Sequence, residues 1–259
     1  MAKPSNTKKE MQEKEEAQLL QLAVPLLKNI YKEFTIDEEQ KDKPDKAIFL
    51  LKPPARFGKR KSKPPRVGIE ITTADPSGYL SYINERKADK KIIHAQINQA
   101  VESGIAPERP LKKVGNRIYH DWIYKGIKDK SKKHCDYVGS GSFDELILLC
   151  CSDVISINSK EFYDGLNDWT DYLLSQDNYP FDKVLFVGAD NKAIQIYNKI
   201  DKRKIAPAPY KYQGDIITTI QFGMIPTGVT WNYKKTASAD PIIEPKISVV
   251  DRGEAPTTR

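Results

Sequence analysis

Cysteine is scarce in this chain, and the spacing of its few copies argues against a fold held together by disulfides or by zinc. Cys135, Cys150 and Cys151 form no CxxC spacing. The sequence therefore predicts neither a disulfide framework nor a zinc knuckle. Few and unpaired cysteines are typical of a reducing compartment, so we expect a cytoplasmic protein.

Long hydrophobic runs are also absent. No stretch reaches the roughly 18 apolar residues that a membrane-spanning helix requires. Residues Met1 to Glu16 are rich in charge and lack the apolar segment of a signal peptide. We therefore expect no insertion into a membrane.

The overall composition is that of a basic globular protein. The 259 residues are enough for one or two domains with a substantial core, although only 39% are hydrophobic. The formal net charge of +7 favours polyanionic partners, with nucleic acid first and an anionic membrane surface second. A charged surface that serves only solubility is the alternative.

The stretch from Pro44 to Thr72 is the most informative part of the sequence. An apolar run, Ala47–Leu51, and a second strand-like segment, Val67–Thr73, flank a polar connection, which predicts a β-hairpin. Glu70 stands in the middle of the second segment. An unpaired buried carboxylate is costly, so Glu70 needs a partner or a function.

The connection itself is basic and rich in proline. It cannot pack as a core element and is predicted to be mobile. As a nucleic-acid contact it would act on phosphates without reading sequence, and a solvated loop with no partner is the alternative. With Lys128 from a later helix, the predicted nucleic-acid contacts are Lys52, Arg56, Lys59, Arg60, Lys61, Lys63 and Arg66.

The remaining pattern predicts an α/β protein. Helices are expected at Lys8–Phe34 (kinked or divided at Pro25), Tyr79–Ile83, Lys87–Ser103, Ile118–Tyr137 and Glu161–Ser175. Buried strands are expected at Leu146–Cys151 and Val184–Val187, a short strand at Ala193–Tyr197, and a strand pair at Asp215–Phe222 and Gly228–Tyr233. This order predicts a mixed central sheet flanked by helices. We expect one α/β domain over residues 1–205, followed by the strand pair and a loose tail over 206–259.

One lysine lies in line with the apolar face of a predicted helix. In the segment Ile118–Tyr137, Lys130 falls on the same face as Ile123, Ile127 and Tyr137. The spacing therefore predicts that Lys130 is directed inward, although a solvated helix surface is an equal alternative for a segment with so many lysines.

Two acids and this lysine are the elements of phosphodiester hydrolysis. Such a reaction requires hard cations held by carboxylate oxygens, and it benefits from an ammonium group near the attacked phosphate. Asp45 and Glu70 are predicted to ligate Mg²⁺ or Mn²⁺, and Glu16 on the first helix is a third candidate ligand. Lys130 would steady the phosphate or the attacking water.

The arrangement of Pro44-Asp45, a spacer and Glu70 in an apolar strand resembles the PD-(D/E)xK nuclease superfamily, with its restriction-endonuclease-like fold. The likeness covers about Glu16 to Gly188 and implies a magnesium-dependent DNA nuclease, with restriction or phage defence as a role. The family usually carries Lys two residues after the acid, and this chain has Thr72 there. Some members carry that lysine on a neighbouring helix, which implies Lys130 here and Lys133 as the next choice.

Two other functions remain open at this point. Thr72 favours a non-catalytic nucleic-acid-binding member of the same fold. An adaptor within a larger assembly is the other, with residues 234–259 as a docking tail. The sequence leaves open DNA against RNA, internal against terminal cleavage, and a homodimer against a larger complex.

Overall fold

The computed structural model describes residues 6–40, 42–57, 63–84, 89–245 and 249–251. The chain forms two compact units. Unit 1 combines Met1–Asp75 with His120–Tyr212, and unit 2 combines Pro76–Tyr119 with Gln213–Arg259. This division differs from the expected boundary at residue 205, because an internal segment groups with the C-terminal one.

Unit 1 is built on a mixed sheet, as the sequence predicted. The sheet has six strands in the order β1-β2-β3-β5-β6-β7. The three N-terminal strands are antiparallel neighbours, β5 and β6 run parallel to β3, and β7 closes the far edge in the antiparallel direction. The strands are β1 (Phe34–Ile36), β2 (Lys46–Leu50), β3 (Arg66–Thr73), β5 (Glu145–Cys151), β6 (Lys183–Val187) and β7 (Ala193–Asn198). The predicted hairpin is therefore confirmed, whereas the sequence pattern did not predict β1.

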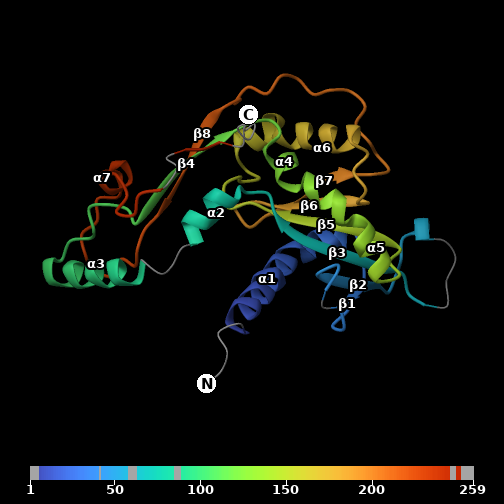
Figure 1. The fold of residues 1–259 in the computed structure, drawn as a ribbon, viewed down its shortest axis with the longest axis horizontal. Helices are drawn as coiled ribbons and strands as arrows, with labels where there is room; N and C mark the ends of the chain where they lie inside the picture. Colours follow the sequence, from blue (N-terminus) through green and yellow to red (C-terminus); the bar gives the residue numbers. More distant parts are fainter. Residues whose placement is uncertain (1–5, 41, 58–62, 85–88, 246–248, 252–259) are drawn as a thin grey trace, which may run out of the picture. The chain divides into compact units, whose positions relative to one another are not determined.

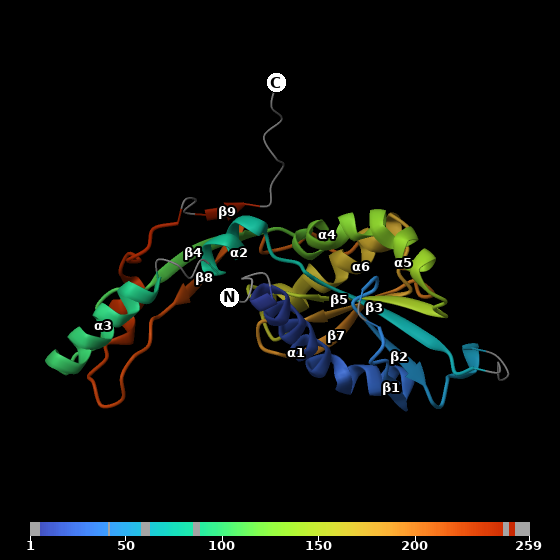
Figure 2. The same cartoon turned by 60° about the horizontal axis from the view of Figure 1, so that its bottom comes forward.

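Helices cover both faces of this sheet (Figures 1 and 2). One face is covered by α1 (Asn6–Tyr31), and the other by α4 (Trp122–Ile127), α5 (His134–Ser140) and α6 (Asn167–Gln176). The apolar stripe of α1 packs through Leu20, Ala23 and Leu27 on alternate residues of the strands, such as Ile69 and Ile147. Since side chains alternate across a strand, Glu70 belongs to the face opposite α1.

Three helix predictions require correction. The α1 helix continues through Pro25 without division. The predicted helix Ile118–Tyr137 is instead three pieces, because α4 is followed by a 3₁₀ segment, η2 (Lys128–Lys133), before α5 begins. Its first residue, Ile118, ends a strand that the sequence analysis missed. The predicted helix Glu161–Ser175 is a π-helical turn, η3 (Phe162–Leu166), followed by α6.

Unit 2 is organised around a three-stranded sheet in the order β8-β4-β9. Its elements are α2 (Ser77–Asn84), α3 (Asp89–Ser103), β4 (Lys112–Ile118), β8 (Asp215–Gln221), α7 (Tyr233–Ser238) and β9 (Val249–Asp251). The expected pairing of residues 215–222 with 228–233 is wrong, because β8 pairs with β4 instead. The tail expected to be loose contains α7 and β9. The predicted start of the helix Lys87–Ser103 lies outside the described residues.

None of the helices in the described ranges is both long and apolar enough to cross a lipid bilayer.

Candidate functional site

Asp45 and Glu70 meet across the β2–β3 hairpin. Lys46 is paired with Ile69 and Ala47 with Gly68, so continuing the register by one residue places Asp45 opposite Glu70. Directly opposed residues of antiparallel strands share one face of the sheet. Asp45 is fixed there because its Oδ2 accepts a hydrogen bond of 2.7 Å from the backbone N–H of Ile71.

Gly68 lets the side chains of Leu146 and Pro44 pack closely against the backbone of β3. A Cβ at Gly68 would lie 2.6 Å from the Leu146 side chain and 2.8 Å from the ring of Pro44. Pro44 directly precedes Asp45. A side chain at Gly68 would therefore displace Pro44 and, with it, the Asp45 carboxylate.

Glu70 is buried and has two donors on the same oxygen. Lys130 Nζ lies 2.6 Å from Glu70 Oε1, and the Tyr137 hydroxyl donates to that oxygen at 2.8 Å. The prediction that Lys130 is directed inward is therefore confirmed, although η2 and not a continuous helix carries it. Thr72, two residues after Glu70, has no part in these contacts.

The environment of Asp45 makes its charged form less favourable than it is in water. Burial and the nearby charge of Glu70 raise the pKa of Asp45 to about 6, against the Ile71 hydrogen bond and the charge of Lys130, which lower it. Two carboxylates that face each other repel when both are ionised. A bound cation between them would remove that cost.

The oxygen atoms present suit a hard cation. Within the described parts of the chain, neither Glu70 Oε2 nor Asp45 Oδ1 has a hydrogen-bond partner, so each has an oxygen available. Mg²⁺ is commonly held by one or two carboxylates, with water and substrate phosphate completing its shell. The Asp45–Glu70 pair fits that pattern.

Glu16 is not brought to this pair by direct contact. Its Oε1 accepts from Gln12 at 2.9 Å, and its Oε2 lies 3.8 Å from Lys46 Nζ. No group of three or more His, Cys, Asp or Glu side chains placed to hold a metal occurs in the described ranges. Glu16 is still close enough for its charge to raise the pKa of Asp45. Lys133 is exposed at the end of η2.

Several cations of the basic connection are paired with acids of the protein itself. Lys52 Nζ lies 2.6 Å from Glu33 Oε1, and Arg66 Nη2 lies 2.5 Å from Asp37 Oδ2. Arg66 also packs its guanidinium over Phe143. These pairs reduce the charge that the connection offers to a phosphate backbone, and their contact with nucleic acid stays a prediction.

Other members of the predicted set are more available or lie elsewhere. Lys63 is exposed and lines a cavity of about 540 Å³ together with Arg66 and Asp144. Lys128 is exposed at the start of η2. Lys59, Arg60 and Lys61 lie outside the described residues.

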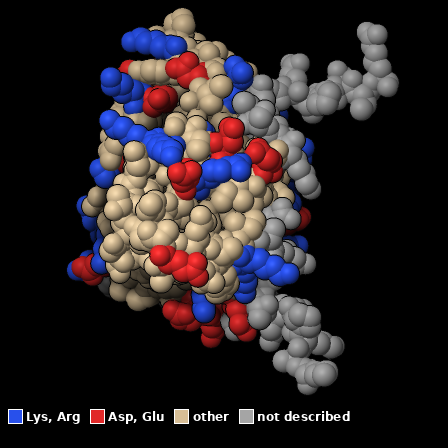
Figure 3. Space-filling view, turned by 90° about the vertical axis from the view of Figure 1, so that its left-hand side faces the viewer, with Lys and Arg blue, Asp and Glu red and all other residues tan. Residues whose placement is uncertain are grey.

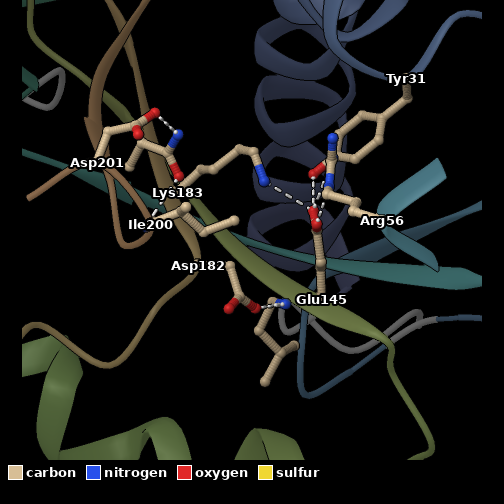
Figure 4. Close-up of polar contacts among 9 residues, drawn as sticks. Tyr31, Arg56, Glu145, Asp182, Lys183, Ile200 and Asp201 are labelled. Carbon is tan, nitrogen blue, oxygen red and sulfur yellow. Dashed lines mark hydrogen bonds and ion pairs between the residues drawn. The ribbon is translucent and has the colours of Figure 1, made fainter. Parts of the chain in front are cut away.

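Arg56 belongs to a buried ionic cluster on the α1 face of the sheet (Figure 4). Glu145, the first residue of β5, accepts hydrogen bonds from Arg56 Nε at 2.7 Å, Lys183 Nζ at 2.9 Å and the Tyr31 hydroxyl at 2.5 Å. Burial would raise the pKa of Glu145, but these hydrogen bonds outweigh it and hold the pKa below its usual range. Arg56 thereby fastens the short 3₁₀ turn η1 (Ala55–Phe57) to the sheet.

Tyr137 is the site residue whose role the sequence analysis missed. It was assigned to the apolar stripe and is indeed buried. The available signal was its position seven residues after Lys130, about two helical turns on the same face. An aromatic residue with a hydroxyl beside an inward lysine is a candidate partner for the same acid.

Comparison of the chain with protein-family models, with curated proteins and with solved structures finds no match.

Proposed function

We propose that the protein is a magnesium-dependent nuclease that hydrolyses DNA phosphodiester bonds and has a restriction-endonuclease-like fold. The observation that carries the proposal is the opposition of Asp45 and Glu70 on one face of the sheet, with Lys130 Nζ 2.6 Å from Glu70. These groups come from a hairpin and a distant 3₁₀ segment, and their convergence is what the resemblance to PD-(D/E)xK nucleases implies.

The order of elements also supports this fold. In unit 1, a long helix is followed by three antiparallel strands, then by helices, then by a strand parallel to the third. The acids lie at the start of the second strand and within the third. Activity depends on the residues of the site and not on the fold.

The chain's residues would divide the work as follows. Asp45 and Glu70 hold the metal, which when bound activates water and neutralises developing charge on the leaving oxygen. Lys130 orients Glu70 and places positive charge near the attacked phosphate. Tyr137 fixes the same carboxylate by its second hydrogen bond. A role in restriction or phage defence follows only by analogy with the family.

Metal-dependent cleavage of DNA tests the proposal. Purified protein is incubated with plasmid and with a linear duplex, with Mg²⁺, Mn²⁺ or EDTA. We expect cleavage with metal, and a loss of about 10²-fold or more in Glu70→Ala, Asp45→Asn and Lys130→Ala. Lys133→Ala is the matched control, because Lys133 is exposed on the same segment. This variant should cleave DNA at the wild-type rate. Equal cleavage by wild type and Glu70→Ala would refute the assignment.

A second function is favoured by one feature of the same site. Lys130 and Tyr137 already occupy one oxygen of Glu70, Oε1, and Thr72 replaces the usual lysine. The site could therefore be a neutralised remnant in a protein that binds nucleic acid without cutting it. Binding of duplex DNA with no cleavage under any metal condition would support this function.

A further inference from the structure

We infer that unit 2 carries a stacking site for single-stranded nucleic acid, formed by the rings of Phe222, Trp231 and Tyr233. The three rings contact one another edge-on or tilted, with centroids 5.3 to 6.0 Å apart. The side chains of Trp231 and Tyr233 are 40% and 54% exposed. We call these three residues the aromatic cluster. The inference does not depend on nuclease activity.

The aromatic cluster is held in place by the backbone around it. Thr230 exchanges hydrogen bonds with the segment after α3, donating to Gly104 O and accepting from Ala106 N, both at 2.9 Å. Trp231 Nε1 donates to Thr236 Oγ1 at 3.3 Å. Asn232 caps α7 by accepting from the N–H of Lys235. Exposed rings that are already fixed lose little conformational freedom when a ligand binds. Their arrangement therefore favours ligand binding over packing in the core.

The chemistry around the rings favours a nucleic-acid strand. Lys234 directly follows Tyr233 and is exposed, and no ion pair is found for it in the described ranges. The segment after β8 packs on α3, where Gly223 faces Ile93 and Gln96, and Lys90 and Lys91 are exposed in the first turn of α3. Bases stack on aromatic rings and phosphates pair with lysines, so this combination suits single strands.

A protein partner is the competing occupant. Val101, Ile105 and Met224 are exposed apolar side chains of the same unit. In the view that faces α3 and α7, charged side chains border a broad uncharged area (Figure 3). The exposed Lys234 beside the rings favours the nucleic acid, because a purely apolar interface gains nothing from an adjacent cation.

Binding of oligothymidylate of about 16 nucleotides, in EDTA so that no metal-dependent step intervenes, tests the inference. We expect wild-type Trp fluorescence to be quenched on binding. The Kd of Trp231→Ala should rise about tenfold or more, with the quenching lost, and Trp231→Phe should retain most of the affinity because it keeps a ring. Tyr163→Ala is the control, since Tyr163 is an exposed tyrosine of unit 1 (64% exposed).

Folding of each variant is checked by its thermal unfolding curve, and Lys234→Ala provides a second variant that leaves the rings intact. We expect Lys234→Ala to weaken binding mainly at low salt. An unchanged Kd in folded Trp231→Ala would overturn the inference. So would a wild-type dimer that dissociates in Trp231→Ala while oligothymidylate affinity stays constant, because the aromatic cluster would then contact a second copy of the chain.

Discussion

At the scale of single residues, the candidate site depends on how one buried carboxylate is satisfied. Glu70 Oε1 accepts from both Lys130 and Tyr137. Hydrogen bonding to the ionised carboxylate offsets the cost of its burial. Burial and the hydrogen bond to Glu70 also raise the pKa of Tyr137, so its hydroxyl remains a donor across the physiological range.

Removal of the Tyr137 hydroxyl should therefore destabilise the fold without unfolding it. In Tyr137→Phe, Glu70 keeps Lys130 but loses one donor, at a cost of about 1.5 kcal/mol. Urea denaturation measures the change. Tyr163→Phe is the control, because Tyr163 is exposed and should change the unfolding free energy by less than about 0.5 kcal/mol. Equal stability of Tyr137→Phe and wild type would show that this hydrogen bond has no net value.

A second buried acid gives the stability a pH dependence. Asp75 is 3% exposed, and its carboxylate accepts from the Ser152 hydroxyl and from the N–H of Asp153. Burial raises the pKa of Asp75 to about 6 despite these hydrogen bonds. The unfolded chain releases this proton near pH 4, so the folded state binds more protons between about pH 4 and 6.

The contribution of Asp75 to stability is thus fully present below about pH 4 and is lost as the pH rises through 6. We expect the unfolding free energy of wild type to fall by about 2 kcal/mol across this window relative to Asp75→Asn, which does not titrate. Denaturation of both proteins at several pH values measures the difference, in which other titrating groups cancel. A constant difference would mean that Asp75 is not perturbed.

At the scale of elements, the cluster around Glu145 connects the basic connection to the sheet. The turn η1 is attached through Arg56, α1 through Tyr31 and β6 through Lys183, and all three meet at the first residue of β5 (Figure 4). The side chain of Lys183 is only 5% exposed, and Glu145 is its counter-ion at 2.9 Å.

Glu145→Ala should lower the unfolding free energy by about 3 to 5 kcal/mol, because Lys183 is left buried without its counter-ion. Arg56→Ala should cost only about 1 kcal/mol, since Arg56 is partly exposed and can be solvated. Thermal and urea denaturation compare the two. The double variant Glu145→Met with Lys183→Met should recover most of the loss. A failure to recover would indicate that packing and not charge governs this position.

At the scale of the whole molecule, net basicity overstates the charge available to a polyanion. Lys52, Arg56 and Arg66 are engaged with Glu33, Glu145 and Asp37. Lys63 and Lys128 are exposed, as Lys52 is, but no ion pair is found for either of them in the described ranges. Salt dependence of binding separates these two groups, because each phosphate contact contributes about one unit to the slope of log K against log salt.

We expect duplex DNA affinity to fall steeply with salt, and the slope to decrease by about 2 in the double variant Lys63→Ala with Lys128→Ala. Lys52→Ala should leave the slope unchanged, because Lys52 is paired with Glu33. Fluorescence anisotropy at several salt concentrations gives the slopes. A flat response in wild type would exclude a phosphate contact by this part of the protein.

Local pattern was sufficient for much of unit 1. Alternation and apolar runs determined β2, β3, β5 and β6, and helical spacing identified the inward direction of Lys130, because these signals lie within a few neighbouring residues. The division of the expected helix into α4, η2 and α5 could not be predicted from the sequence. Lys130 and Tyr137 lie on a similar face whether the segment is one helix or three pieces.

The amino-acid sequence by itself determined the mixed sheet, the hairpin and the acids and lysine worth testing. Tertiary structure alone decided that β8 pairs with β4, that Tyr137 shares Glu70 with Lys130, and that Arg56 is bound to Glu145. The physical reason is distance along the chain. Periodicity records which face of an element is buried, but the partner across that face is chosen by packing between segments that are far apart in sequence.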